Sequence, residues 1–108
     1  MILNAIGKGL YPDYVGRRMI FTGSGSGPTL YVPTTGDPVT LGDPRLYIDA
    51  MFGGAMSVSG NYFVRPQPAG TGVRQTWALR WFLTNGTEAG AINLSAEQVQ
   101  LGCFVGQF

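Results

Sequence analysis

Apolar and polar residues alternate most clearly over residues 73–83 of the sequence. One face of this segment carries Val73, Gln75, Trp77, Leu79, Trp81 and Leu83, and the other carries Arg74, Thr76, Ala78, Arg80 and Phe82. Successive side chains of a strand point to opposite faces, so the pattern predicts a strand with both tryptophans on its buried side. At helical spacing, the same residues would scatter charged and apolar groups around the whole helix.

Three other segments show the same period of two. Their predicted inward positions are Leu46, Ile48, Ala50 and Phe52 in residues 46–52; Met56, Val58, Tyr62 and Val64 in residues 55–65; and Val99, Leu101, Cys103 and Val105 in residues 98–105. Shorter apolar runs predict strands at residues 18–22, 29–32 and 91–94. No window of the chain has a convincing helical period.

The 17 glycines and 7 prolines fall between these runs as turn residues. Residues 23–28 (GSGSGP) predict a flexible loop, and Gly-Asp-Pro at 36–38 and again at 42–44 predicts two turns. Asn85-Gly86 is the strongest turn signal, and residues 95–98 predict one helical turn with Ser95 as its cap. The fold class that follows is all-β, an antiparallel β-sandwich or jelly roll of about seven or eight short strands.

The first 18 residues lack this regularity. Gly7, Gly9 and Gly16 weaken any helix there, and Tyr11-Pro12-Asp13 is typical of a turn. We therefore expect an extended N-terminal arm over residues 1–18 and a single β-sandwich domain over residues 19–108. A chain of 108 residues is long enough for one such domain to bury a core without disulfides or metals.

Charge is scarce along the whole chain. Only 12% of the residues are Asp, Glu, Lys or Arg, against roughly 25% in ordinary soluble domains, while 44% are hydrophobic. We interpret this as a surface that is partly covered by other protein; a monomer coated with neutral polar groups is the alternative. The net charge of +1 gives no attraction to nucleic acid or to an anionic membrane.

The usual catalytic and metal-binding residues are missing or isolated. The chain has no histidine and a single cysteine, Cys103, which excludes a His-supported nucleophile, a Cys/His zinc site and an internal disulfide. The acidic residues are scattered, and the glycines before Pro28 lead into a predicted strand rather than a phosphate-binding helix. We expect no enzyme activity and no cofactor. The segments are also too short and too polar for a membrane span or a signal peptide, so synthesis in the cytoplasm is expected.

Aromatic residues make up 12% of the chain and are the best candidates for binding. Trp77 and Trp81 could stack on sugars if they were exposed, but their apolar neighbours favour the core. The candidates for a protein interface are instead residues of the arm and of the closing strand. They are Tyr11, Tyr14, Arg17, Arg18, Phe104 and Phe108.

Several segments together resemble a known class of protein. These are the short strands with GDP turns, the alternating VRQTWALRWFL, the TNGTEAG turn and the closing INLSAEQVQLGCFVGQF. In style and layout they resemble the small jelly-roll capsid decoration, or cement, proteins of tailed bacteriophages. No motif can be matched position by position, so the resemblance implies no individual functional residue.

The resemblance implies a structural virion protein that binds and stabilises an assembled capsid. Its partner would be the major capsid protein or another virion protein, and the chain itself would form a dimer or trimer. It would be made in the host cytoplasm and reside in the virion, without binding nucleic acid or membrane. The alternative function is a carbohydrate-binding β-sandwich module of an adhesin or phage tail, which requires exposed tryptophans or tyrosines in a groove.

Overall fold

The computed structural model describes residues 1–6, 13–15, 18–51, 53–70 and 76–108. In these residues the backbone forms strands, turns and loops without a helix, so the predicted all-β class is confirmed. The strands are β1 (Ile2–Ala5), β2 (Asp13–Val15), β3 (Arg18–Ser26), β4 (Asp37–Pro38), β5 (Thr40–Leu41), β6 (Leu46–Met51), β7 (Ala55–Met56), β8 (Tyr62–Ala69), β9 (Thr76–Leu83) and β10 (Gln98–Gln107).

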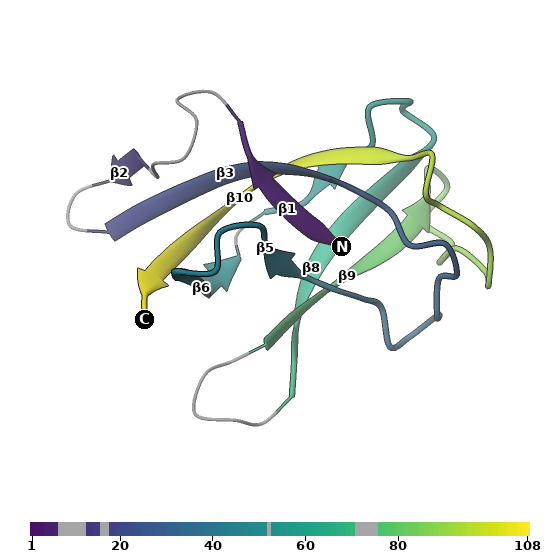
Figure 1. The fold of residues 1–108 in the computed structure, drawn as a ribbon. Coiled ribbons are helices and arrows are strands. Elements are labelled where there is room, and N and C mark those ends of the chain that lie inside the picture. The colour runs from purple at the N-terminus through teal and green to yellow at the C-terminus, as the bar shows by residue number, and fades with distance from the viewer. Residues whose placement is uncertain (7–12, 16–17, 52, 71–75) are drawn as a thin grey trace.

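The strands form two sheets that pack against one another across a shared apolar core (Figure 1). The larger sheet has the order β5-β1-β3-β10-β6, with β2 also paired to β3, and the smaller sheet has the order β4-β9-β8-β7. β1 and β5 run parallel, so the larger sheet is mixed rather than purely antiparallel.

The chain joins the two sheets on both sides of the core. On one side, β4 pairs with β9 in the smaller sheet and β5 pairs with β1 in the larger sheet, with one residue between them. That residue, Val39, donates its backbone N–H to the carbonyl of Trp77 at 2.9 Å. On the other side, the Val58 N–H donates to the Gln98 carbonyl at 2.8 Å. These connections give the sandwich a barrel-like character.

The two long alternating segments form strands, as the sequence predicts, although β9 also buries Ala78 and Phe82 on the face opposite the tryptophans. β10 buries Val99, Leu101, Cys103 and Val105. In β9, Leu79 and Trp81 are fully buried, and Trp77 is half-buried against the core. The core position predicted for the tryptophans is therefore confirmed for Trp81 and is only partly right for Trp77.

The glycine- and serine-rich segment at residues 23–28 is not the flexible loop that its composition predicts. Most of it belongs to β3, which pairs with β1 on one side and with β10 on the other. A Cβ atom on Gly23 would lie 2.7 Å from the Phe21 ring, and one on Gly25 would lie 2.6 Å from Cγ of Met1. Glycine is present because neighbouring atoms approach this part of the strand too closely for a side chain.

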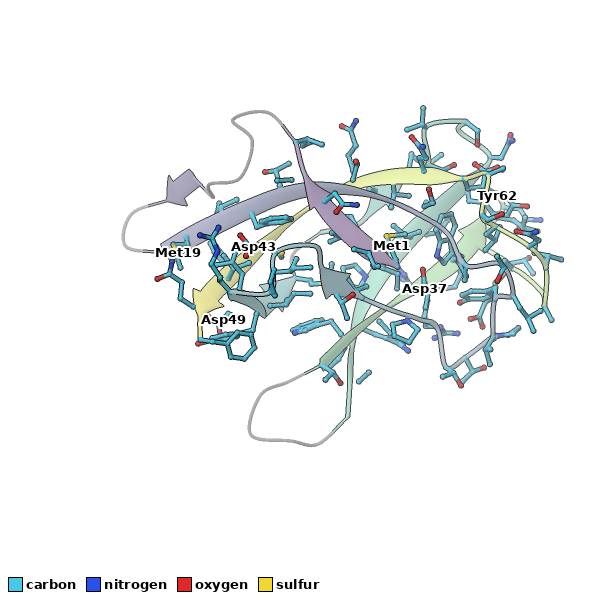
Figure 2. All side chains as sticks on the ribbon, in the orientation of Figure 1. Met1, Met19, Asp37, Asp43, Asp49 and Tyr62 are labelled. Carbon is cyan, nitrogen blue, oxygen red and sulfur yellow. The ribbon has the colours of Figure 1, made fainter. Side chains whose placement is uncertain are left out.

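The start of the chain is not the irregular arm that was predicted. β1 lies between β5 and β3, and Leu3 is fully buried in the core. The α-ammonium group of Met1 lies 2.8 Å from Oδ1 of Asp37 and donates to the Pro38 carbonyl at 2.5 Å; Figure 2 shows Met1 and Asp37 next to one another. A four-residue strand is too short to show a period, so only its distant partners reveal it.

Asp37 also corrects the prediction of a turn at the first Gly-Asp-Pro. Asp37 and Pro38 form β4 and pair with Leu79 and Ala78 of β9. The second Gly-Asp-Pro does precede a turn, which leads into β6. The same tripeptide therefore adopts two conformations. Only the first copy lies beside the edge of β9 that β8 leaves open, and it pairs with that edge.

The strand predicted over residues 55–65 is instead a hairpin of β7 and β8. The Ser57 N–H donates to the Tyr62 carbonyl at 2.8 Å, and Gly60 adopts a φ of +79° in the turn. Met56 and Val58 are therefore not core residues, since 53% and 70% of their surfaces are exposed. The alternation was correct for Val64, which is fully buried.

Smaller corrections concern the other short apolar runs. Residues 29–32 and 91–94 form no strand. Residues 95–96 form an ordinary turn instead of the predicted helical turn. In β6, Met51 rather than Ala50 is buried, because the pairing with β10 shifts register between Phe104 and Val105. Phe52 lies outside the described residues.

Candidate functional site

The predicted interface residues fall into two groups. Tyr11 and Arg17 lie outside the described residues, whereas Tyr14 on β2 and Arg18 on β3 belong to paired strands. Phe104, on β10, is half-buried and pairs with Ile20 of β3. β2, β3 and β10 are neighbours in the larger sheet, so the backbone positions of Tyr14, Arg18 and Phe104 share one region of it.

Phe108 belongs to a different feature, a pocket between the two sheets that we call the inter-sheet pocket. Its volume is about 350 Å³, at the lower end of the range for ligand pockets. The lining comes from β5, β6, β9 and the loops beside them, and comprises Val39, Thr40, Leu41, Asp43, Pro44, Leu46, Tyr47, Ile48, Thr76, Trp77 and Phe108. Figure 1 shows β5, β6, the start of β9 and the C-terminus in this part of the molecule.

Two aromatic rings form one wall of the inter-sheet pocket. The rings of Tyr47 and Phe108 are 5.2 Å apart at an angle of 59°, and the Phe108 N–H donates to the Arg45 carbonyl at 3.0 Å. Gly106 makes this arrangement possible, because a Cβ atom there would lie only 2.4 Å from the Tyr47 ring. Phe108 remains 77% exposed, so a large apolar ring stands at the mouth of an apolar pocket.

The charged groups beside the pocket neutralise one another. Arg45 binds Asp43 through Nε at 3.0 Å and through a terminal guanidinium nitrogen at 2.7 Å. These hydrogen bonds, with one from the Arg45 backbone N–H, lower the pKa of Asp43 to about 2. The pocket therefore offers apolar contact without a net charge, which suits an apolar side chain or small apolar group.

A second apolar feature lies where two loops meet, and we call it the loop patch. It consists of Leu30, Val32 and Ile92, which are 63%, 49% and 41% exposed. Between Leu30 and Val32, the Tyr31 N–H donates to the Ile92 carbonyl at 3.0 Å, which holds the two loops together. Exposed apolar side chains that cluster in this way are typical of protein contacts.

A polar cluster underneath fixes these loops. The Tyr31 hydroxyl donates to Oε2 of Glu88 at 2.8 Å and accepts the backbone N–H of Trp81 at 3.0 Å. Arg80 donates to both carboxylate oxygens of Glu88, at 2.7 and 3.2 Å. Burial is the main cause that raises the pKa of Tyr31 to about 12. Each group is partnered within the cluster, which gives it a structural role.

Three other reactive groups of the described residues are also engaged or buried. The Ser59 hydroxyl donates to Glu97 at 2.5 Å, and Asp37 binds the α-ammonium group of Met1. Cys103 is fully buried, and burial raises the pKa of its thiol to about 12. A neutral, inaccessible thiol is a poor nucleophile.

In the part of the chain that the structure describes, no three His, Cys, Asp or Glu side chains come close enough together to hold a metal ion. Nor does the same part contain a helix with the length and apolar character needed to cross a membrane.

Comparison with protein-family models, curated proteins and solved structures found no match. The chain's own surfaces are therefore the evidence for its function. Apart from Phe108, sequence reasoning missed the inter-sheet pocket, because its lining comes from three distant parts of the chain. One sequence feature did point to the pocket. Trp77 is the first apolar residue of β9, so it lies at the end of the strand, where the core opens toward the surface.

Proposed function

We propose that this chain is a non-catalytic structural protein that binds other proteins through apolar surfaces, as a capsid decoration protein does. The observation that carries the proposal is the exposed aromatic ring of Phe108 over the inter-sheet pocket. In a chain with 12% charged residues, such a site favours association over solubility as a free monomer.

The composition supports a permanent rather than a brief association. Obligate protein interfaces are larger and more apolar than transient ones. The loop patch adds Leu30, Val32 and Ile92 to the apolar surface, and its loops are fixed by the Glu88 cluster. A surface that is already rigid loses little conformational entropy when a partner covers it.

The carbohydrate-binding alternative is less well supported. It needs aromatic rings with an exposed face, and Trp81 is fully buried. Trp77 is half-buried in an apolar lining, where few polar groups converge to bind sugar hydroxyls. No observation in the described residues favours this function over protein binding.

Sedimentation of a lysate of the cells that produce this protein tests the proposal. An antibody would follow the chain through a sucrose gradient, and we expect it in the fractions of large particles together with their main shell protein. Phe108→Thr should move at least about half of the chain to the slow fractions, since interface aromatics contribute on the order of 2 kcal/mol.

The matched control is Ile2→Thr, which replaces an apolar residue that is 58% exposed and lies outside the pocket lining. This variant should remain with the particles. Recovery of the unmodified chain in the slow fractions alone would contradict the proposal. Equal loss from both variants would contradict the role of the inter-sheet pocket.

A further inference from the structure

The outer face of the smaller sheet carries an ordered set of side chains that the proposed function does not use. In the pairing of β7, β8 and β9, Met56 lies opposite Phe63, Phe63 opposite Phe82, and Arg65 opposite Arg80. These five residues form two adjacent rows, one apolar and one cationic. We call them the arginine–phenylalanine face.

The two rows contact one another through the Phe82 ring. The rings of Phe63 and Phe82 are stacked, with centroids 5.2 Å apart and an angle of 17° between their planes. The guanidinium carbon of Arg65 lies 4.7 Å from the Phe82 centroid, and that of Arg80 lies 5.4 Å from it. Both cations are therefore held in place on a rigid aromatic base.

The two arginines differ in what neutralises them. Arg80 forms an ion pair with Glu88 at 2.7 Å. Arg65 is exposed and contacts Phe82, with no carboxylate in an ion pair with it among the described residues. It also lies directly opposite Arg80, a position where like charges disfavour the sheet. An incoming anion would relieve this repulsion.

The surface beside Arg65 has room for a ligand on both sides. One hollow of about 210 Å³ is lined by Arg65, Pro66, Gln67, Arg80 and Phe82. Another is a shallow, open depression lined by Gly54, Ala55, Met56, Phe63, Val64 and Arg65. Arg65 stands between a polar hollow and an apolar one, and Met56 is 53% exposed beside the latter.

We infer that the arginine–phenylalanine face binds an extended segment of a partner protein in which a carboxylate and a large apolar side chain are two residues apart. The carboxylate pairs with the guanidinium fork of Arg65, and the apolar side chain lies against Met56 and Phe63. The spacing follows from the face itself, because its two rows are two residues apart on β8 and an extended partner has the same repeat. This inference rests on the proposed protein-binding function and names the chemistry of one partner.

A carboxylate fits this face better than the phosphates of a nucleic acid. Nucleic acid binding draws on several cations along a backbone. On this face Glu88 already neutralises Arg80, and Arg65 is then the one arginine of the face without an ion pair in the described residues. The net charge of +1 provides no wider positive field. A planar guanidinium with one free fork is instead suited to a single bidentate carboxylate.

Titration of the folded chain with short peptides, followed by ¹⁵N NMR, tests the inference. The probe is an acetylated and amidated Thr-Glu-Thr-Phe-Thr peptide, and its matched control has Gln in place of Glu. We expect the Glu peptide to shift the amide signals of Met56, Phe63, Arg65 and Phe82, with a Kd of about 1 mM. The Gln peptide should bind about fivefold more weakly, since one charge-assisted pair is lost.

Variants of the protein separate this site from general charge effects. Arg65→Gln should weaken binding of the Glu peptide about fivefold and leave the Gln peptide unaffected. Arg45→Gln removes an exposed arginine beside the inter-sheet pocket and should change neither. Thermal unfolding of Arg65→Gln should stay within about 3 °C of the original, because a lost cation–π contact is offset by relieved repulsion.

Equal affinity for the two peptides, or equal effects of the two arginine variants, would overturn the inference. So would tighter binding of a five-nucleotide oligothymidylate, which would indicate a nucleic-acid site. Absence of any shift with the Glu peptide up to about 10 mM would also exclude it. If the peptides fail while the particle sedimentation succeeds, this face is wrong and the proposed function stands.

Discussion

The carboxylate of Glu88 accepts hydrogen bonds from three residues, two in the loop at residues 31–35 and one on β9. Its donors are the Arg80 guanidinium, the Thr34 backbone N–H at 2.8 Å and the Tyr31 hydroxyl at 2.8 Å. The Arg80 bonds contribute most, and together these donors lower the pKa of Glu88 to about 2. One carboxylate thus links the loop at residues 33–35 to the outer face of β9.

The lowered pKa of Glu88 predicts a loss of stability in acid. The folded state holds this carboxylate ionised, so its contribution is present above its ordinary value of 4.5 and is lost as the pH falls toward about 2. We expect the free energy of unfolding to fall as the pH is lowered through this range. In Glu88→Gln, the free energy of unfolding should change less steeply with pH. Urea unfolding at a series of pH values measures both.

Asp43 also has a pKa near 2, so Asp43→Asn serves as a comparison at an exposed site. Its ion pair with Arg45 is local, and solvent should make its effect on the slope smaller. A slope that Glu88→Gln leaves unchanged would show that the cluster does not couple folding to pH.

Tyr31 gives a prediction that does not depend on charge. Tyr31→Phe removes the hydroxyl that accepts a hydrogen bond from the buried backbone N–H of Trp81 and that donates one to Glu88. An unsatisfied buried N–H costs about 1–3 kcal/mol, so urea unfolding should show a destabilisation of that size. Tyr62→Phe, a half-buried tyrosine in edge contact with Trp81, is the control and should change stability by less than about 0.5 kcal/mol. Similar losses in both variants would contradict the role assigned to the Tyr31 hydroxyl.

At the scale of the strands, β1 and β3 depend on glycine at their contact. A Cβ atom on Gly25 would lie 2.6 Å from Cγ of Met1 and 2.7 Å from the Ile2 carbonyl oxygen. Gly25→Ala should therefore push β1 away from β3 and destabilise the fold by about 1–3 kcal/mol, as measured by urea unfolding. Gly90→Ala, where nothing lies within 4 Å, should be neutral or stabilising. Equal effects at the two glycines would exclude this close approach as the reason for glycine in β3.

The sequence predicts the elements that carry their own pattern. β10, over ten residues, buries the face that its alternation indicates. β9, over eight residues, buries Leu79 and Trp81 as indicated, but it also buries Ala78 and Phe82 on the opposite face. β1, β4 and β5 have two to four residues each, and their conformations depend on distant partners such as β9. Composition misled at residues 23–28, because glycine served close packing there rather than flexibility.

At the scale of the molecule, the candidate surfaces combine residues that no local pattern connects. The inter-sheet pocket needs Val39, Trp77 and Phe108 together, and the loop patch needs Leu30 and Ile92. The sequence did indicate a surface poor in charge, and one of its interface candidates, Phe108, lines the pocket. It could not indicate the pocket, because the meeting of β5, β6 and β9 is a property of the sheet order.

The apolar features lie at different ends of a body of 37 × 31 × 22 Å, since the loops of the loop patch are at the right of Figure 1 and the C-terminus is at the left. A stable interface covers roughly 800 Å² per partner, about an eighth of the 6305 Å² that this chain exposes. There is room for contact at both ends. We therefore predict that the isolated protein self-associates.

Sedimentation equilibrium between about 1 and about 100 µM should give masses that rise above the 11.5 kDa of one chain. Replacing Leu30 and Ile92 together with serine tests the loop patch, and Phe108→Ser tests the inter-sheet pocket. If the loop patch of one copy contacts the inter-sheet pocket of another, either replacement lowers the mass. If each surface contacts the same surface of another copy, only the replacement at the surface that is used lowers it. A mass of 11.5 kDa at every concentration would contradict self-association, and a partner for these surfaces would then have to be a different protein.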